Sequence, residues 1–138
     1  MRLLSLDIGL RRTGVAFFDD ATGIPLPLDT LRHASVGELL TQLSDILTSR
    51  RIEKIIVGLP LLPSGDEGAQ VAEVRGVAQK LEEKGYQIVF VDERYTTPRS
   101  GASLRQAKHA PPRSDGDAAA ACEILRTFVE KNDTKTSG

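Results

Sequence analysis

Residues 3–18 read LLSLDIGLRRTGVAFF, and this stretch decides the fold. Residues 3–6 and 14–18 are mostly apolar, which predicts two buried strands. Residues 9–13 between them are short enough for a tight connection, so the two strands are expected to pair antiparallel. A third strand is predicted around Leu26 and Leu28, and its prolines place it at a sheet edge.

The apolar period changes after this meander. Ser35 followed by Glu38 is a capping-box pattern, and the residues that follow recur at helical spacing to about Arg50. Continuous apolar runs at 54–58 and 88–91 indicate strands buried on both faces. The remaining predicted elements are a helix ended by Gly85, a short helix after Glu93, and a last helix capped by Ser114 or Asp115.

The predicted order is three strands, helix, strand, helix, strand and two helices. Strands joined through helices run parallel, so the meander and the two crossovers give an α/β fold. We expect a mixed five-stranded sheet, three antiparallel strands followed by two parallel ones, with helices on both faces. That arrangement is similar to the RNase H-like architecture.

Composition predicts one globular domain over residues 1–132. Of 138 residues, 40% are hydrophobic and 27% charged, while residues 133–138 have no apolar anchor and are expected to be a disordered tail. The single cysteine, Cys122, excludes an internal disulfide. With no signal-like start and no apolar run long enough to span a bilayer, we expect a cytoplasmic protein without membrane contact.

Three acids stand where chemistry is expected. Asp7 ends the first strand, Glu93 follows the last, and ligands bind at the carboxyl ends of parallel strands. Asp117 shares a helix face with Ala121 and Ile124, so its carboxylate is expected at the rim of the sheet. Each acid also has an ordinary interpretation, since it could form an Asx turn or cap a helix or the segment that follows it.

Converging carboxylates repel one another unless a cation joins them, and hard divalent ions prefer oxygen ligands. Two such ions can activate a water and stabilise the leaving oxygen of a phosphodiester.

The loop from Gly58 to Gly68 lacks a P-loop lysine and is interpreted as structural. The net charge of −1 argues against a general DNA-coating protein, although five cations and no acid occupy 94–113.

Four segments resemble motifs of the YqgF family. They are LDIG with RRTGVA at 6–16, VGLPL at 57–61 with Gly65 and Gly68, VDERYTT at 91–97, and the helix that begins near Asp117. The resemblance spans residues 3 to about 130 and implies an RNase H-like nuclease that uses Mg²⁺ or Mn²⁺, with two ions expected. Asp7, Glu93 and Asp117 match the family's acidic positions, as catalytic residues and metal ligands.

Nucleic acid is the expected partner, and ribosomal particles are a possible one. The residues expected to contact its phosphates are Arg11, Arg12, Arg94, Arg99, Arg105, Lys108 and Arg113. Residues 98–102 and 108–113 depart from the family pattern, and Asp115 offers a second acid beside Asp117; we choose Asp117 because Asp115 is the better cap.

The resulting hypothesis is a metal-dependent nuclease for the 5′ end of pre-16S ribosomal RNA. Two alternatives remain open: a Holliday junction resolvase, and a non-catalytic nucleic-acid or ribosome-binding module of the same fold. An ATPase ranks last, because actin-like proteins duplicate this domain around their nucleotide cleft. The sequence leaves open whether the chain is a monomer or a homodimer.

Overall fold

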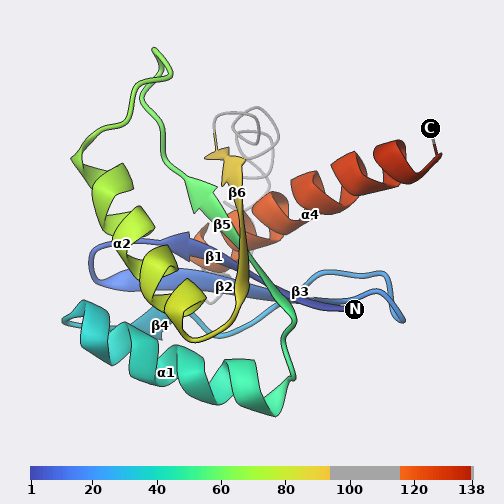
Figure 1. The fold of residues 1–138 in the computed structure, drawn as a ribbon, viewed down its shortest axis with the longest axis horizontal. Helices are drawn as coiled ribbons and strands as arrows, with labels where there is room; N and C mark the ends of the chain where they lie inside the picture. The colour runs from blue at the N-terminus through green and yellow to red at the C-terminus, as the bar shows by residue number, and fades with distance from the viewer. Residues whose placement is uncertain (94–115, 138) are drawn as a thin grey trace.

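The computed structural model describes residues 1–93 and 116–137, with side chains of the last helix described for 118–131. The strands are β1 (Arg2–Ile8), β2 (Arg12–Asp19), β3 (Leu26–Pro27), β4 (Leu31–Arg32), β5 (Lys54–Leu59) and β6 (Gln87–Asp92). The helices are α1 (Val36–Ser49), α2 (Ala69–Glu83) and α4 (Gly116–Ser137). The strand order is β3-β2-β1-β5-β6 (Figure 1). β1 and β2 pair antiparallel, while β1, β5 and β6 are parallel, which confirms the predicted mixed sheet.

The predicted third strand is the main difference. It is split into β3 and β4, which both pair antiparallel with β2, so the described residues form a sheet of six strands rather than five. Proline has no backbone N–H, so Pro25 and Pro27 limit β3 to two residues. The expected edge position is confirmed, because β3 begins the strand order.

Helices cover both faces of the sheet, as predicted. Side chains alternate along β1, so Leu4 and Leu6 pack in the cluster that contains α1 and α2. Leu3 packs in the second cluster, with Ala121 and Leu125 of α4. Figure 1 shows α4 behind the sheet, opposite α1 and α2. Asp7 has the parity of Leu3 along β1 and therefore projects toward the α4 side.

The helix ends follow the sequence closely. Ser35 caps α1, where its Oγ accepts from the N–H of Glu38 at 3.2 Å, and Glu38 Oε1 accepts from the N–H of Ala34 at 3.1 Å. Gly85 follows α2 with φ of 103°, the left-handed conformation that glycine adopts most readily after a helix. Both predicted helix signals are confirmed.

α4 extends further than predicted. It runs to Ser137, through most of the residues 133–138 that the sequence indicated as a disordered tail. No proline or glycine interrupts residues 117–137, and adding a residue to an existing helix costs less than starting one. The predicted short helix after Glu93 and the caps at Ser114 and Asp115 lie outside the described residues. None of the described helices combines the length and apolar run needed to cross a bilayer.

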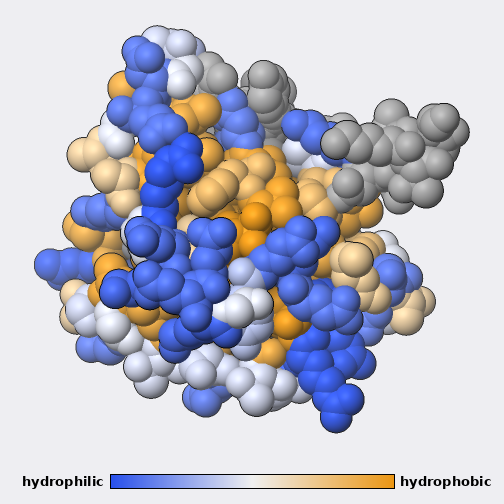
Figure 2. Space-filling model, in the orientation of Figure 1, coloured by the Kyte–Doolittle hydropathy of each residue, from blue (hydrophilic) through white to orange (hydrophobic). Residues whose placement is uncertain are grey.

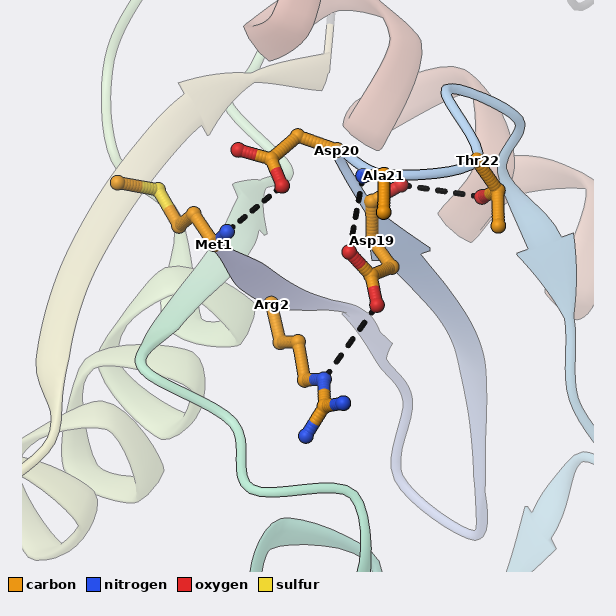
Figure 3. Close-up of polar contacts among 6 residues, drawn as sticks. All are labelled: Met1, Arg2, Asp19, Asp20, Ala21 and Thr22. Carbon is orange, nitrogen blue, oxygen red and sulfur yellow. Dashed lines mark hydrogen bonds and ion pairs between the residues drawn. The ribbon is translucent and has the colours of Figure 1, made fainter.

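Polar contacts join the start of β1 to the end of β2 (Figure 3). Arg2 Nε contacts Asp19 Oδ2 at 3.4 Å, and the Met1 amino group contacts Asp20 Oδ1 at 2.7 Å. Asp19 also accepts from the N–H of Ala21 at 2.9 Å. Surface ion pairs contribute little stability. They do mark the register that sets Asp7 opposite Gly14 at the other end of the pair.

β6 ends the strand order on the side opposite β3. Ile88, Val89 and Phe90 of this strand are only partly buried. Figure 2 shows apolar residues gathered in the middle of the face where Figure 1 places β6. Among the described strands, β6 pairs only with β5, so Glu93 directly after it has a strand neighbour on one side only.

Candidate active site

The carboxyl ends of three parallel strands bring Asp7 and Glu93 to one edge of the sheet. The β1–β5 ladder pairs Leu6 with Val57, and the β5–β6 ladder pairs Leu59 with Asp92. Asp7 and Glu93 are the next residues of β1 and of the chain after β6. Both are half-buried, and the central strand β5 lies between them.

Gly58 on β5 provides the space in which Glu93 lies. A Cβ at this position would be 2.6 Å from Glu93 Oε1 and 2.9 Å from Glu93 Cγ. It would also be 2.5 Å from Ile124 Cδ1 of α4. Non-bonded heavy atoms are not found this close, so a larger residue would have to displace Glu93 or α4. The glycine lets the Glu93 side chain cross β5 beneath α4.

Glu93 reaches Asp7 across this space. Burial, a side-chain hydrogen bond with Asp7, and the charges of Asp7 and Asp92 raise the pKa of Glu93 to about 8. In the metal-free protein at neutral pH the Glu93 carboxyl therefore keeps its proton and donates it to Asp7. Two carboxyl groups that share one proton offer hard oxygen ligands, and a divalent cation can take the place of that proton.

The donor set that the described residues provide is two carboxyl groups, which fits a divalent cation. Among these residues no cluster of three histidine, cysteine, aspartate or glutamate side chains is found. Mg²⁺ commonly takes one or two carboxylates and completes its shell with water and substrate oxygens. The pair alone therefore satisfies the protein's usual share of such a site.

Three contacts fix the direction of α4 over the sheet. Ser5 Oγ, on β1, donates to the carbonyl of Ala121 at 2.7 Å. Ile124 packs on Gly58 near the end of β5, and Lys54 Nζ at its start lies 5.5 Å from the Phe128 ring. α4 therefore runs opposite to β5, with its first turn toward the strand ends that carry Asp7 and Glu93.

Asp117 belongs to that first turn. Its backbone lies one helical turn before Ala121. The position of its carboxylate lies outside what the structure describes, so its meeting with the other two acids stays a prediction.

The predicted basic residues divide into two groups. Arg11 lies in the turn between β1 and β2, and Arg12 begins β2; both are exposed at the end of the sheet where Asp7 lies. The other predicted phosphate contacts lie outside the described residues; they are Arg94, Arg99, Arg105, Lys108 and Arg113. Asp115 also lies outside the described residues.

Sequence reasoning missed two residues that shape the site. Gly58 is predicted both as the last residue of the strand at 54–58 and as the first of a structural loop, with no role in the site. Glycine within a strand often marks a close approach of another group. Ser5 is a fully buried hydroxyl within an apolar strand, and a buried hydroxyl needs a partner. From the sequence alone, neither signal indicates which residue is contacted: Glu93 in the case of Gly58, and Ala121 in the case of Ser5.

Comparison with known proteins identifies the family. A family model described as RuvX, Holliday junction resolvase, matches residues 1–131. The chain belongs to the RuvX family. The resemblance to the YqgF family is thereby confirmed, since RuvX and YqgF denote the same family.

Two RuvX relatives and two solved structures show how far the likeness extends. A protein of Sulfurihydrogenibium sp., named "Putative pre-16S rRNA nuclease", is 32% identical over 133 residues and covers 94% of this chain and 90% of its own. One of the same name from Anaeromyxobacter sp. is 34% identical, with coverages of 94% and 97%. T. thermophilus RuvC, solved in complex with a Holliday junction substrate, has a TM-score of 0.62 at 15% identity, covering 95% and 96%. The fowlpox virus Holliday junction resolvase has a TM-score of 0.60 at 12% identity, covering 95% and 99%. The structures confirm the RNase H-like fold.

Proposed function

We propose that this RuvX-family protein is a nuclease that uses divalent cations to hydrolyse phosphodiester bonds of structured nucleic acid. The observation that carries the proposal is the Asp7–Glu93 carboxyl pair at the carboxyl ends of β1 and β6. The pair is half-buried, so it costs stability when both members ionise, and a carboxyl pKa raised this far is typical of functional sites. Cation binding is the use that the oxygen donors fit.

The three acids have distinct positions in this proposal. Asp7 and Glu93 hold the cations from the sheet, and Asp117 completes the set from the first turn of α4. Bound Mg²⁺ or Mn²⁺, with two ions expected, would supply an activated water and stabilisation of the leaving oxygen. Arg11 and Arg12 bind phosphate oxygens of the substrate beside the acids, as do the cations of 94–113.

The proposed substrate is the 5′ end of pre-16S ribosomal RNA. The protein would meet it in the cytoplasm, either as free RNA or within ribosomal particles. This substrate is favoured by the name of the two relatives, pre-16S rRNA nuclease. Both relatives match nearly the whole chain, at 32% and 34% identity. The family description favours a second candidate, a Holliday junction, which RuvC binds on a similar fold. Both substrates require the same carboxylates.

A cleavage assay tests the proposal and separates the substrates. Precursor rRNA, single-stranded RNA and a four-way DNA junction are each incubated with Mg²⁺, with Mn²⁺ and with a chelator. Asp7→Asn is expected to lower cleavage at least about 100-fold while binding and folding persist. Asp45→Asn, which removes an exposed acid of α1, serves as the matched control and is expected to be active.

The outcomes are distinct. Preferred cleavage of precursor rRNA supports the first substrate, and preferred resolution of the junction supports the second. Undiminished metal-dependent cleavage by Asp7→Asn would refute the mechanism. Binding without cleavage by the wild-type protein under every condition would leave the non-catalytic module as the function.

A further inference from the structure

A basic groove lies beside the turn that connects β1 and β2. It has a volume of about 590 Å³ and is lined by Arg11, Arg12, Arg32, His33, Ala34 and Glu38. Arg12 and Arg32 are direct cross-strand partners on β2 and β4. Like charges in that relationship destabilise a sheet. An anion bound between the three arginines of the groove would offset this repulsion.

Two of the groove's three arginines, Arg11 and Arg32, have no acidic partner among the described residues, 1–93 and 118–131. Glu38 is the one acid that lines the groove, and its Oε1 accepts from the N–H of Ala34 at the start of α1. The groove therefore presents more positive than negative charge to a ligand.

His33 holds the groove in shape rather than adding charge. Its side chain is only 6% exposed, and its Nε2 lies 2.8 Å from Thr13 Oγ1 on β2. Burial lowers the pKa of His33 from its ordinary value, so the ring is neutral at pH 7. This contact fixes the chain after β4 against β2 and thereby sets the position of Arg32.

An apolar pocket adjoins the basic groove and shares His33 and Ala34 with it. Its volume is about 380 Å³, and its apolar lining comes from Ile8, Leu10, Val36, Leu39 and Val77. Leu10 is 73% exposed and Val36 is 42% exposed, both large apolar residues at the surface. Exposed apolar residues that border a pocket commonly mark a ligand site.

We propose that the groove and the pocket together bind one unpaired nucleotide of a nucleic-acid strand. Arg11, Arg12 and Arg32 hold its phosphate by charge-assisted hydrogen bonds, and its base enters the apolar pocket. A base in a duplex is stacked and paired, so only an unpaired one can enter. That the ligand belongs to a nucleic-acid strand rests on the proposed function. Ile8, which lines the pocket, follows Asp7 in β1 but faces the opposite side of the sheet, so a nucleic-acid strand bound here would reach the acid pair around the end of β1.

Binding measured without divalent cations tests this proposal independently of cleavage. A short single-stranded RNA, the same RNA in a duplex, adenosine monophosphate and inorganic phosphate are titrated in the presence of chelator. The variants are Arg32→Gln for the groove and Leu10→Ser for the pocket. Lys84→Gln removes one exposed charge at the far end of α2 and serves as the matched control.

Arg32→Gln is expected to weaken single-strand binding about tenfold and to reduce the dependence of log affinity on log salt by about 0.7. It should also weaken phosphate binding, while Leu10→Ser weakens only ligands that carry a base, by about threefold to tenfold. Single-stranded RNA should bind more tightly than the duplex and than adenosine monophosphate.

Equal effects of Arg32→Gln and Lys84→Gln would overturn the phosphate site, and no effect of Leu10→Ser would overturn the base pocket. Tighter binding of the duplex would refute an unpaired nucleotide, and equally tight adenosine monophosphate would make the occupant a free nucleotide. If these binding tests fail while Asp7-dependent cleavage persists, only this inference is lost. If cleavage fails and the binding pattern holds, the proposed chemistry is wrong and the site stands.

Discussion

The Glu93 carboxyl group forms a hydrogen bond with Asp7, although their strands β6 and β1 are not neighbours in the sheet. The intervening strand β5 permits the contact because Gly58 has no side chain. The pair therefore depends on three strands, a glycine, and the packing of Ile124 from α4. A change in any of these parts is expected to act on the acids without removing them.

Gly58→Ala tests the space beneath Glu93. The added Cβ would lie 2.6 Å from Glu93 Oε1, so we expect the glutamate to move and cleavage to fall at least about tenfold. The crowding should also cost about 1–3 kcal/mol of unfolding free energy. The measurements are kinetics and urea unfolding.

Gly37→Ala is the matched control for that variant. Its Cβ would meet only Ser35 Oγ, at 3.8 Å, so we expect unchanged cleavage and a stability gain of up to about 1 kcal/mol. A fully active Gly58→Ala protein would show that Glu93 does not need this position.

Glu93→Gln tests the shared proton through the pH dependence of stability. The pKa of Glu93 is about 8 in the folded protein and near 4.5 when unfolded, so between these values the folded state holds more protons. The carboxyl therefore makes the metal-free protein less stable as pH rises from about 4.5 to about 8. In chelator, Glu93→Gln should be more stable than wild type by roughly 2–4 kcal/mol at pH 8 and about equal near pH 4.5.

Thermal unfolding across this range provides the measurement. Glu83→Gln, at the exposed end of α2, controls for loss of an acid and should follow the wild-type curve. Parallel curves for Glu93→Gln and wild type would mean that Glu93 titrates as an ordinary surface acid.

Ser5→Ala tests whether the tie between α4 and β1 positions the site. It removes the buried hydrogen bond to the Ala121 carbonyl and should cost about 1 kcal/mol. We also expect slower cleavage, because the first turn of α4 carries Asp117. Thr127→Ala removes a buried hydroxyl bond that stays inside α4, to the Glu123 carbonyl, so it should cost similar stability without slowing cleavage. Equal cleavage by both variants would contradict a positioning role for Ser5.

Local signals in the sequence predicted most of the fold. The capping box at Ser35 and the helix stop at Gly85 depend on neighbours along the chain, and both were confirmed. The parallel strands followed from their helical connections. The prediction of the third strand was only partly right. Its two prolines cannot donate backbone hydrogen bonds, and which of the neighbouring residues still pair with β2 depends on the tertiary structure.

The site was less predictable for a physical reason. Sheet ends indicated that Asp7 and Glu93 lie near each other, but their contact depends on a glycine in a third strand. Arg32 was missed because its partner Arg12 is distant in sequence and meets it only through the β2–β4 pairing. Such contacts belong to the tertiary structure, and no local pattern encodes them.

Crystals grown with Mn²⁺ test the central claim, that Asp7 and Glu93 share a cation, most directly. Anomalous scattering locates manganese without reference to any assumed substrate. We predict an ion within about 2–2.5 Å of carboxylate oxygens from both residues. No such ion at saturating Mn²⁺, or an ion that neither carboxylate contacts, would contradict the account.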